Sequence, residues 1–251
     1  MNVSQCVSHA SSWAMNAVSH MKSVLITGAN RGIGLEHARR FAAHGAQVFA
    51  TARSPDEAKE LRALAAMKDL RIEIFAYEAS DAEAPARLKV ALGNTPLDLL
   101  FANAGAPSDK TQSFGSINVE NTLELVRINA LAPLKLVEVL ADNVARSQRK
   151  VIAFQSSRLG SVGDNSTGGY YPYRIAKCAL NMVTKNVSID LKPRGVIVVA
   201  LHPGWVRTRM GGASAPVSVE ECVTGQQRLL EELKPDHSGR FFNYDGSELP
   251  W

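Results

Sequence analysis

The stretch that decides the fold reads KSVLITGANRGIGLEHARRFAAHG and spans residues 22–45. It opens with Val24–Ile26, a short apolar run rich in β-branched residues, which predicts a buried strand rather than a helix. Glycines crowd the next segment, 28–34, where they permit a sharp turn and a close approach of a phosphate to the backbone. An amphipathic helix follows to about His44 and ends at Gly45, and the free N–H groups at its start favour anions. The stretch therefore predicts a strand, a phosphate-binding turn and a helix.

The rest of the chain continues this alternation of strands and helices. We predict further strands at residues 47–52, 71–77, 97–102, 150–155, 196–201 and 241–243, and helices from Pro55, at 81–92, at 119–145 with an interruption at Pro133, at 172–191 and at 219–233. Strands that alternate with helices form a parallel sheet covered on both faces. The predicted fold is thus α/β: a single-domain, doubly wound, Rossmann-type parallel sheet with helices on both faces, over residues 22–251.

The first twenty residues differ from the rest. Residues 1–20 are polar, rich in serine and without an acidic residue. They lack the basic start and the continuous apolar core of a secretory signal. Because Met21 is followed at once by the first predicted strand, we interpret residues 1–21 as a disordered extension or a misassigned start.

The composition is that of one ordinary globular domain. The chain has 251 residues, with 28 Lys and Arg against 24 Asp and Glu, and its formal charge of +4 is spread along the sequence. It has no basic run of the kind found in nucleic-acid arms and no apolar stretch of membrane-spanning length, so we expect neither nucleic acid nor membrane as a partner. The three cysteines, Cys6, Cys178 and Cys222, are too far apart for a disulfide framework or a zinc site, and the six histidines form no ligand pattern. We therefore expect no metal and a reduced, cytoplasmic setting.

The residues that point to chemistry are Tyr173 and Lys177, which follow a Ser-Ser-x-x-Gly segment at 156–160. Four residues are about one helical turn, so both side chains project from the same face of the predicted helix. A neighbouring ammonium favours the phenolate and lowers the pKa of a phenol from roughly 10, so this tyrosine can act as an acid near neutral pH. Tyr170 and Tyr171 have no lysine four residues on, which selects Tyr173.

Several motifs taken together resemble the short-chain dehydrogenase/reductase family. They are the glycine spacing T-G-x-x-x-G-x-G at 27–34, Asn-Ala-Gly at 103–105, and the tyrosine–lysine pair. The resemblance covers essentially all of residues 22–251. The segments Tyr-Tyr-Pro-Tyr-Arg at 170–174 and His-Pro-Gly-Trp-Val-Arg-Thr at 202–208 further resemble the C-factor-like and sniffer-type carbonyl reductase subgroup.

The resemblance implies roles for four catalytic residues. Tyr173 would give a proton to a carbonyl oxygen during reduction and act as the base during oxidation. Lys177 would hold the nicotinamide ribose. Ser157 would hydrogen-bond the substrate oxygen as charge builds there, with Ser156 as the alternative. Asn129 would hold a water that relays protons to the lysine.

The resemblance also implies a nicotinamide cofactor, and two arginines bear on which one. Arg31 lies in the glycine turn and Arg53 follows the second predicted strand, where an acidic residue would repel a 2′-phosphate. Two guanidinium groups can clamp a phosphate, so we predict that NADP(H) is preferred, with NAD(H) as the alternative. Glu78 stands where the family usually has an aspartate near the adenine. The predicted cofactor-binding residues are Gly28, Asn30, Arg31, Gly32, Ile33, Gly34, Arg53, Glu78, Asn103, Ala104, Gly105, Tyr173, Lys177, Pro203, Gly204, Val206 and Thr208.

These inferences predict an NADP(H)-dependent oxidoreductase that acts on a small carbonyl or alcohol compound. The subgroup also implies an alternative, a nucleotide-binding, C-factor-like signalling protein in which catalysis is secondary. The connection after the sixth predicted strand is short, so we expect an open pocket, and its candidate walls are Tyr170, Tyr171, Trp205 and Met210.

Two of the predicted helices, at 119–145 and 172–191, carry apolar residues beyond one face. These residues are Leu123, Val126, Val183 and Val187. They predict a homodimer or homotetramer.

Overall fold

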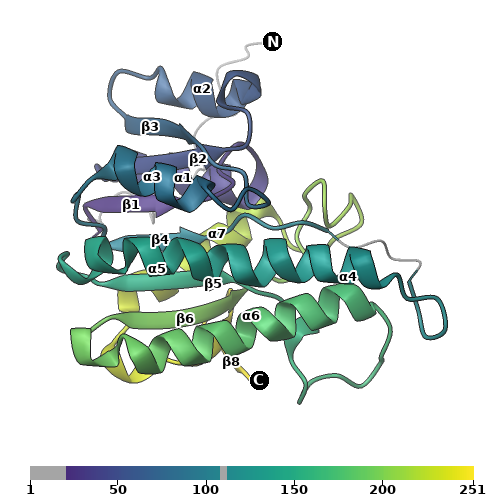
Figure 1. Cartoon of the computed structure of the whole chain (residues 1–251). Coiled ribbons are helices and arrows are strands. Elements are labelled where there is room, and N and C mark those ends of the chain that lie inside the picture. Colours follow the sequence, from purple (N-terminus) through teal and green to yellow (C-terminus); the bar gives the residue numbers. More distant parts are fainter. Residues whose placement is uncertain (1–20, 108–111) are drawn as a thin grey trace, which may run out of the picture.

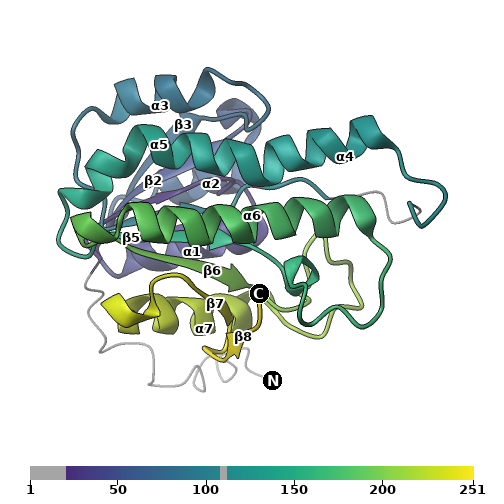
Figure 2. The same ribbon diagram turned by 60° about the horizontal axis from the view of Figure 1, so that its bottom comes forward.

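One sheet runs through the molecule, and helices cover both of its faces (Figures 1 and 2). The structure is a computed structural model that describes residues 21–107 and 112–251. Its strands are β1 (Ser23–Ile26), β2 (Gln47–Ala52), β3 (Arg71–Ala76), β4 (Leu99–Ala102), β5 (Val151–Gln155), β6 (Ile197–His202), β7 (Arg240–Asn243) and β8 (Glu248–Leu249). They pair in the order β3-β2-β1-β4-β5-β6-β7-β8, in parallel throughout except for the antiparallel pair of β7 and β8.

The helices divide between the two faces of the sheet. They are α1 (Gly32–Ala43), α2 (Lys59–Ala65), α3 (Ala84–Leu92), α4 (Val119–Val126), α5 (Ala132–Ala145), α6 (Tyr171–Asp190) and α7 (Val219–Glu232). α1, α2 and α7 pack on one face and share a core layer with Val24 and Ile26. α3, α5 and α6 pack on the other face with Leu25, and α4 lies beside α6 (Figure 2). Successive residues of β1 thus point to opposite layers, as the pleat of a strand requires.

The order in which successive strands are added to the sheet reverses at β1. Val24 lies opposite Val48 of β2 on one side and opposite Leu99 of β4 on the other. The first three strands are laid down to one side of this point and the later ones to the other. In open α/β sheets, ligands bind at the carboxyl ends of the strands where the order reverses. The fold therefore directs attention to the ends of β1, β4 and β5.

The predicted α/β class and parallel sheet are confirmed, while three details differ. Pro55–Glu57 is a 3-10 turn, and the helix begins only at Lys59. The break in the long helix is a π-helical turn at Arg127–Leu131, one turn before Pro133. The reason is that a proline lacks the N–H that would bond to the residue four positions earlier, so the disturbance appears upstream of the ring. The short antiparallel strand Glu248–Leu249 was not predicted.

Of the predicted N-terminal extension, residues 1–21, the structure describes only Met21. Met21 is 1% exposed and packs in the same core layer as Val24 and Phe41, so it belongs to the folded domain. Residues 1–20, the remainder of the predicted extension, lie outside the described residues.

The predicted oligomer face is partly corrected. Val187 is buried and Val183 packs against the same inner layer, so both face the sheet. Apart from Tyr171 at its first position, the exposed apolar residues of α6 are instead Ile175, Met182 and Ile189, seven positions apart, and α4 contributes Leu123. Spacing of seven places the three residues of α6 on one stripe.

The described residues show neither a membrane span nor a metal cluster. None of their helices has the length and apolar character needed to cross a bilayer. Within 21–107 and 112–251, no three His, Cys, Asp or Glu side chains are grouped so that they could hold a metal ion. Cys178 and Cys222 are free thiols, and Cys6 lies outside these ranges.

Candidate active site

The glycine turn packs so closely against the end of β4 that two of its glycines, Gly28 and Gly34, leave no room for a side chain. A Cβ atom on Gly28, whose φ is +67°, would lie 3.0 Å from Cα of Ala104. A Cβ atom on Gly34 would lie 2.5 Å from the carbonyl oxygen of Gly28 and 2.6 Å from Nδ2 of Asn103. Asn103 ties the turn down, since its Nδ2 donates to the carbonyl oxygens of Thr27 (2.9 Å) and Gly28 (3.3 Å). The result is a cradle of bare backbone at the start of α1, as an anion-binding turn requires.

Ser157, Tyr173 and Lys177 come together at the carboxyl end of β5. α6 begins at Tyr171, so Tyr173 and Lys177 lie one turn apart near its start. The hydroxyl of Ser157 hydrogen-bonds Tyr173, and Nζ of Lys177 lies 5.7 Å from the centroid of the Tyr173 ring. Nζ of Lys177 donates to the carbonyl oxygen of Gln155, at 2.9 Å. Three of the four predicted catalytic side chains are thus neighbours.

Burial decides the ionisation of this group. It raises the pKa of Tyr173 to about 12, and the hydrogen bond with Ser157 offsets part of that rise. Burial also lowers the pKa of Lys177 to about 8, so the amine is still mainly protonated at neutral pH. The expectation that the ammonium lowers the pKa of the phenol is not met, because withdrawing a phenolate from water outweighs the nearby favourable interactions.

Two adjacent serines end β5, and the structure separates them. Ser156 is 3% exposed and its hydroxyl donates to Oδ1 of Asn181 at 2.5 Å, on the side of α6. Ser157 faces Tyr173. Of the two serines, Ser157 is therefore the one that lies beside Tyr173.

Asn129 occupies the middle of the π-helical turn and is 1% exposed. Its Oδ1 accepts from the backbone N–H of Ala106 at 3.1 Å, and its Nδ2 donates to the carbonyl oxygens of Ala106 (3.2 Å) and Leu125 (3.1 Å). A Cβ atom on Gly105 would lie 2.6 Å from this Oδ1. Asn129 therefore clamps the segment after β4 against the helix, and it can do so because Gly105 has no side chain.

The predicted phosphate clamp is only partly free. Arg53 has 77% of its side chain exposed, and its Nε lies 3.5 Å from Oε2 of Glu78. An exposed pair of this kind contributes little and is readily exchanged for another anion. Arg31 is exposed and precedes α1 as its N-cap residue. Both guanidinium groups thus remain accessible, and Glu78 lies beside one of them.

The loop after β6 folds back over the glycine turn. Val206 is buried and bridges to Val217, which closes the loop at its base. Ile33 packs against the cluster that these valines form with Cys222. A Cβ atom on Gly32 would lie 3.4 Å from Cγ2 of Thr208, so the loop reaches the turn itself. The predicted cofactor residues Asn30, Pro203 and Gly204 lie in the same turn and loop.

Two loops follow the carboxyl ends of β5 and β6, and we call them the rim loops: residues 158–169 and 203–217. Arg207 holds the second through hydrogen bonds from Nη1 to the carbonyl oxygens of Ala215 (3.0 Å) and Pro216 (2.7 Å). Arg174 holds the first in the same manner, by donating to carbonyl oxygens within it.

A histidine joins the two rim loops. Nδ1 of His202, at the end of β6, accepts from the backbone N–H of Arg158 at 3.2 Å. Burial lowers the pKa of His202 to about 4, so it is neutral and available as an acceptor at neutral pH. The candidate pocket walls Tyr170, Tyr171, Trp205 and Met210 are all among the exposed apolar residues.

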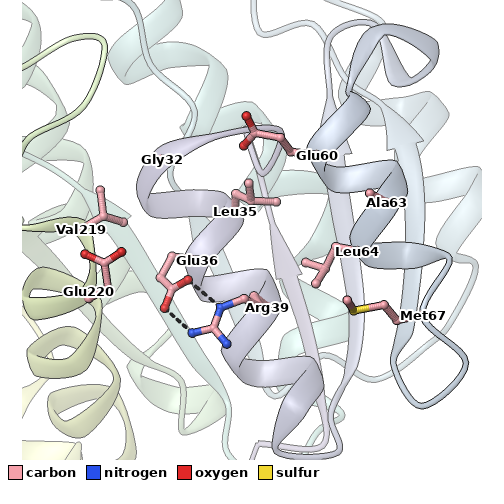
Figure 3. Close-up of a pocket in the computed structure, with 10 residues that line it drawn as sticks. All are labelled: Gly32, Leu35, Glu36, Arg39, Glu60, Ala63, Leu64, Met67, Val219 and Glu220. Carbon is pink, nitrogen blue, oxygen red and sulfur yellow. Dashed lines mark hydrogen bonds and ion pairs between the residues drawn. The ribbon is translucent and has the colours of Figure 1, made fainter. Parts of the chain in front are cut away.

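A cleft of about 500 Å³ opens elsewhere, between α1, α2 and α7 (Figure 3). Leu35, Leu64 and Val219 contribute to its apolar lining, and an ion pair of Glu36 with Arg39 lies along α1 within it. Of the predicted site residues, Gly32 is the one that lines it. The cleft therefore lies apart from the reacting centre.

Two residues of the site were not predicted individually. Gln155 supplies the carbonyl oxygen that holds Lys177. A Cβ atom on Gly160 would lie 2.6 Å from the carbonyl carbon of Lys177, so this glycine lets α6 approach the loop. The Ser-Ser-x-x-Gly spacing carried the signal for Gly160, whereas a main-chain oxygen leaves no signal in a sequence.

Fold and site together define a Rossmann-type oxidoreductase, and known proteins agree. The profile of the short chain dehydrogenase family matches residues 22–216. The carbonyl reductase Sniffer of D. melanogaster is 35% identical with a TM-score of 0.84, over 92% of this chain and 100% of that one. The NADPH-bound carbonyl reductase from chicken fatty liver is 33% identical with a TM-score of 0.84, over 92% and 99% of the two chains. The C-signal protein of Myxococcus xanthus is 40% identical over 156 residues, 62% of this chain and 93% of that protein. The chain belongs to the short-chain dehydrogenase/reductase family.

Proposed function

We propose that this protein is an NADP(H)-dependent carbonyl reductase or alcohol dehydrogenase that acts on small molecules, with Tyr173 as its general acid and base. The observation that carries the proposal is the meeting of Ser157, Tyr173 and Lys177 at the end of β5. The glycine turn lies beside this group at the point where the strand order reverses.

The residues present fit a nicotinamide dinucleotide. The cradle that a Cβ on Gly28 or Gly34 would fill offers bare backbone to a diphosphate. Arg31 and the loosely paired Arg53 suit a 2′-phosphate. Three solved relatives contain bound NADP or NADPH, which supports NADP(H) over NAD(H) for this chain.

Hydride transfer is the chemistry that a bound nicotinamide supplies. The chain's own residues handle the proton and the charge. Tyr173 donates its phenolic proton to the carbonyl oxygen, while Ser157 donates a hydrogen bond to the same oxygen as negative charge develops there. The ammonium of Lys177 lies 5.7 Å from the centroid of the tyrosine ring, so it favours the phenolate left behind.

Asn129 is proposed to supply the proton relay through its main chain rather than its side chain. Its amide atoms are engaged with Ala106 and Leu125. In an α-helix its main-chain carbonyl would accept from the N–H of the residue four positions on. That residue is Pro133, which has no N–H. A carbonyl without that helical donor is suited to hold a water.

Replacing Tyr173 by Phe tests the proposal. We expect turnover of aldehydes, ketones or quinones with NADPH to fall by at least about 100-fold, since a positioned acid contributes that much or more. NADPH binding by calorimetry should stay close to wild type. Retention of full turnover in the variant would exclude Tyr173 as the acid. The similarity to C-signal supports a second candidate, a signalling protein, and wild-type protein that binds NADPH yet reduces none of these compounds would favour it.

Cofactor choice has its own measurement, calorimetry of NADPH against NADH. We expect NADPH to bind at least about tenfold more tightly, because a guanidinium–phosphate bond contributes about 1.5–3 kcal/mol. Arg53→Asp should remove most of that preference. A preference for NADH in the wild type would contradict the clamp formed by Arg31 and Arg53.

The exposed stripe on α6 supports a homodimer or homotetramer. Ile175, Met182 and Ile189 are 45%, 61% and 58% exposed, and Leu123 of α4 is 62% exposed. Patches of this kind are usually covered by a partner. A monomer in sizing chromatography would contradict this assembly. We propose a cytoplasmic location, in keeping with the free thiols of Cys178 and Cys222.

A further inference from the structure

Three buried polar side chains form a row behind the reacting centre, on the face of the sheet covered by α1 and α7. Nε2 of His37, from α1, lies 2.9 Å from Oε1 of Gln226, from α7. Nε2 of Gln226 donates to Oε1 of Gln155, the last residue of β5, at 3.1 Å. The exposed fractions of His37, Gln226 and Gln155 are 0%, 0% and 8%. The row thus links three elements through side chains far apart in the sequence.

The direction of these bonds follows from the atoms involved. An amide oxygen only accepts, so Nε2 of His37 carries the proton. Burial lowers the pKa of His37 to about 4, so the ring is neutral at physiological pH and its Nδ1 is bare. This Nδ1 and Nε2 of Gln155, the two ends of the row, have no hydrogen-bond partner within the residues that the structure describes. The row is therefore costly, because unpaired buried polar atoms oppose folding.

Packing alone does not account for a histidine at this position. The ring stacks on Phe41 with a centroid distance of 5.8 Å and meets Phe101 edge-on at 4.8 Å. An apolar aromatic side chain packs equally well in such surroundings and leaves no atom unpaired. The polar identity of His37 therefore serves the bond to Gln226.

Gln155 lies at the end of β5, where the backbone has fewer strand partners than in the middle of the sheet. β4 ends opposite Phe154, so among the described strands Gln155 pairs with β6 alone, through Leu201. Its carbonyl oxygen nevertheless holds Nζ of Lys177 at 2.9 Å, and Ser157 follows two residues later. A strand end paired on one side is less constrained than the strand interior. The side-chain bond from Gln226 supplies the missing restraint.

We propose that His37, Gln226 and Gln155 form a positioning network that fixes the end of β5 and thereby orients Lys177 for catalysis. The proposal rests on the function proposed above. None of the three side chains is assigned contact with the substrate. Their effect passes through the carbonyl of Gln155 to the ammonium of Lys177.

The first test compares two adjacent buried glutamines of α7. Gln226→Met breaks the row, whereas Gln227→Met removes a side chain of the same size that is 8% exposed and outside the row. For Gln226→Met we expect kcat to fall by about five- to tenfold, the loss of one aligned hydrogen bond, with KM nearly unchanged. We also expect the alkaline limb of the pH profile of kcat to move to lower pH, because an ammonium that loses its carbonyl acceptor gives up its proton more easily. Gln227→Met should change neither quantity.

A second pair of variants covers the case in which changes in α7 disturb folding. His37→Gln keeps an N–H group that can donate to Gln226, and His37→Phe keeps the ring packing without the donor. We expect His37→Phe to lower kcat and shift the alkaline limb as Gln226→Met does, and His37→Gln to restore most of both. The double variant His37→Phe/Gln226→Met should lose no more than the single variants, because both break one row.

The outcomes separate this proposal from the function on which it rests. If Tyr173→Phe abolishes turnover while Gln226→Met and His37→Phe match Gln227→Met in kcat and in pH profile, the positioning network is overturned and the enzyme assignment stands. Equal losses of kcat in Gln226→Met and Gln227→Met, without a shift of the alkaline limb, would likewise contradict the proposal and show that the row contributes only through packing. If Tyr173→Phe retains turnover, the proposed function itself fails.

Discussion

A Cβ atom added to Gly34 in the glycine turn would lie 2.5 Å from a backbone oxygen, whereas one added to Gly163 in the rim loops would find its nearest atom at 3.3 Å. The first position is closed by the backbone of Gly28 and Ala29 and by the side chain of Asn103, and the second has room to adjust. The two regions meet at the same site. The rim loops also have close backbone contacts, since a Cβ atom on Gly160 or Gly211 would lie 2.6 or 2.0 Å from a backbone atom, but the segment around Gly163 has no contact that close. Arg174 and Arg207 hold the rim loops by donating several hydrogen bonds to their carbonyl oxygens.

This contrast suits the two halves of the proposed reaction. A cofactor is the same molecule in every turnover, so its cradle gains from being rigid and bare. A pocket whose loops are held by hydrogen bonds from arginine side chains to carbonyl oxygens can change its shape when a single arginine is substituted. Close packing therefore constrains the glycine turn and the ends of the rim loops at Gly160 and Gly211, while polar side-chain contacts constrain the segment around Gly163.

The largest expected effect comes from adding the same methyl group to both regions. Gly34→Ala places Cβ within 2.5 Å of the carbonyl oxygen of Gly28, so the turn must shift. We expect a loss of about 3 kcal/mol or more in the free energy of unfolding, the upper range for overpacking, and a loss of most NADPH binding. Thermal or urea unfolding and calorimetry measure the two quantities.

Gly163→Ala is the matched control in the rim. Its Cβ would lie 3.3 Å from the main-chain oxygen of Trp251, a contact that a loop can relieve. We expect stability and NADPH affinity near wild type. Equal damage from both alanines would remove the distinction between the regions.

Acid should affect both regions, through one buried histidine in each. His37 near the glycine turn and His202 at the rim have pKa values lowered by burial to about 4, against about 6.5 when unfolded. Between these values the unfolded chain binds more protons, so stability present above pH 6.5 is lost as the pH falls toward 4. For His37 the loss is about 3 kcal/mol.

Urea unfolding at pH 7 and near pH 4 checks this dependence. His37→Gln and His202→Gln should each flatten the acid side of the curve. Protonated His202 also loses its role as acceptor for Arg158, so the rim should loosen in acid, seen as faster amide exchange at 158–169. An acid slope unchanged in both variants would place its origin in the carboxylates instead.

The smallest effect concerns the rim alone. Arg207→Met removes the bonds to Ala215 and Pro216, and because the guanidinium is exposed we expect a cost of about 1 kcal/mol. The loop should become more mobile, which raises KM for the carbonyl substrate by about fivefold and leaves NADPH affinity unchanged. Arg209→Met, a neighbouring exposed arginine, is the control. A large loss of NADPH affinity in Arg207→Met would show that rim and turn are not independent.

The strand pattern of the sequence was enough to predict the sheet. Runs such as Val151–Gln155 are too apolar for a surface segment and too short for a helix, so they are recognisable as buried strands from the sequence alone. The break in the long helix was predicted at Pro133 but occurs at Arg127–Leu131, because a proline acts on a carbonyl one turn upstream. The two-residue strand Glu248–Leu249 depends on a tertiary partner and has no local pattern.

The site was predictable where chemistry lies in side chains at short spacing. Tyr173 and Lys177 belong to one helix, and Ser157 could be narrowed to a pair of serines. The row from His37 to Gln226 was not predictable, since those residues are 189 positions apart and each alone reads as an ordinary helical residue. The pKa of Tyr173 was also missed, because burial cannot be weighed before the fold is known.

The π-helical turn at Arg127–Leu131 has one residue more than an α-helical turn would hold. In genetic terms it is equivalent to a single codon inserted into a regular helix. Deleting one residue there would shorten the turn to α-helical length, although Pro133 would still lack its N–H, and α4 would rotate by about 100° about its axis relative to α5. Asn129 would swing away from Gly105, and the exposed stripe of α4 would turn with it. One codon therefore couples the geometry of the reacting centre to the surface on which copies of this chain are proposed to meet.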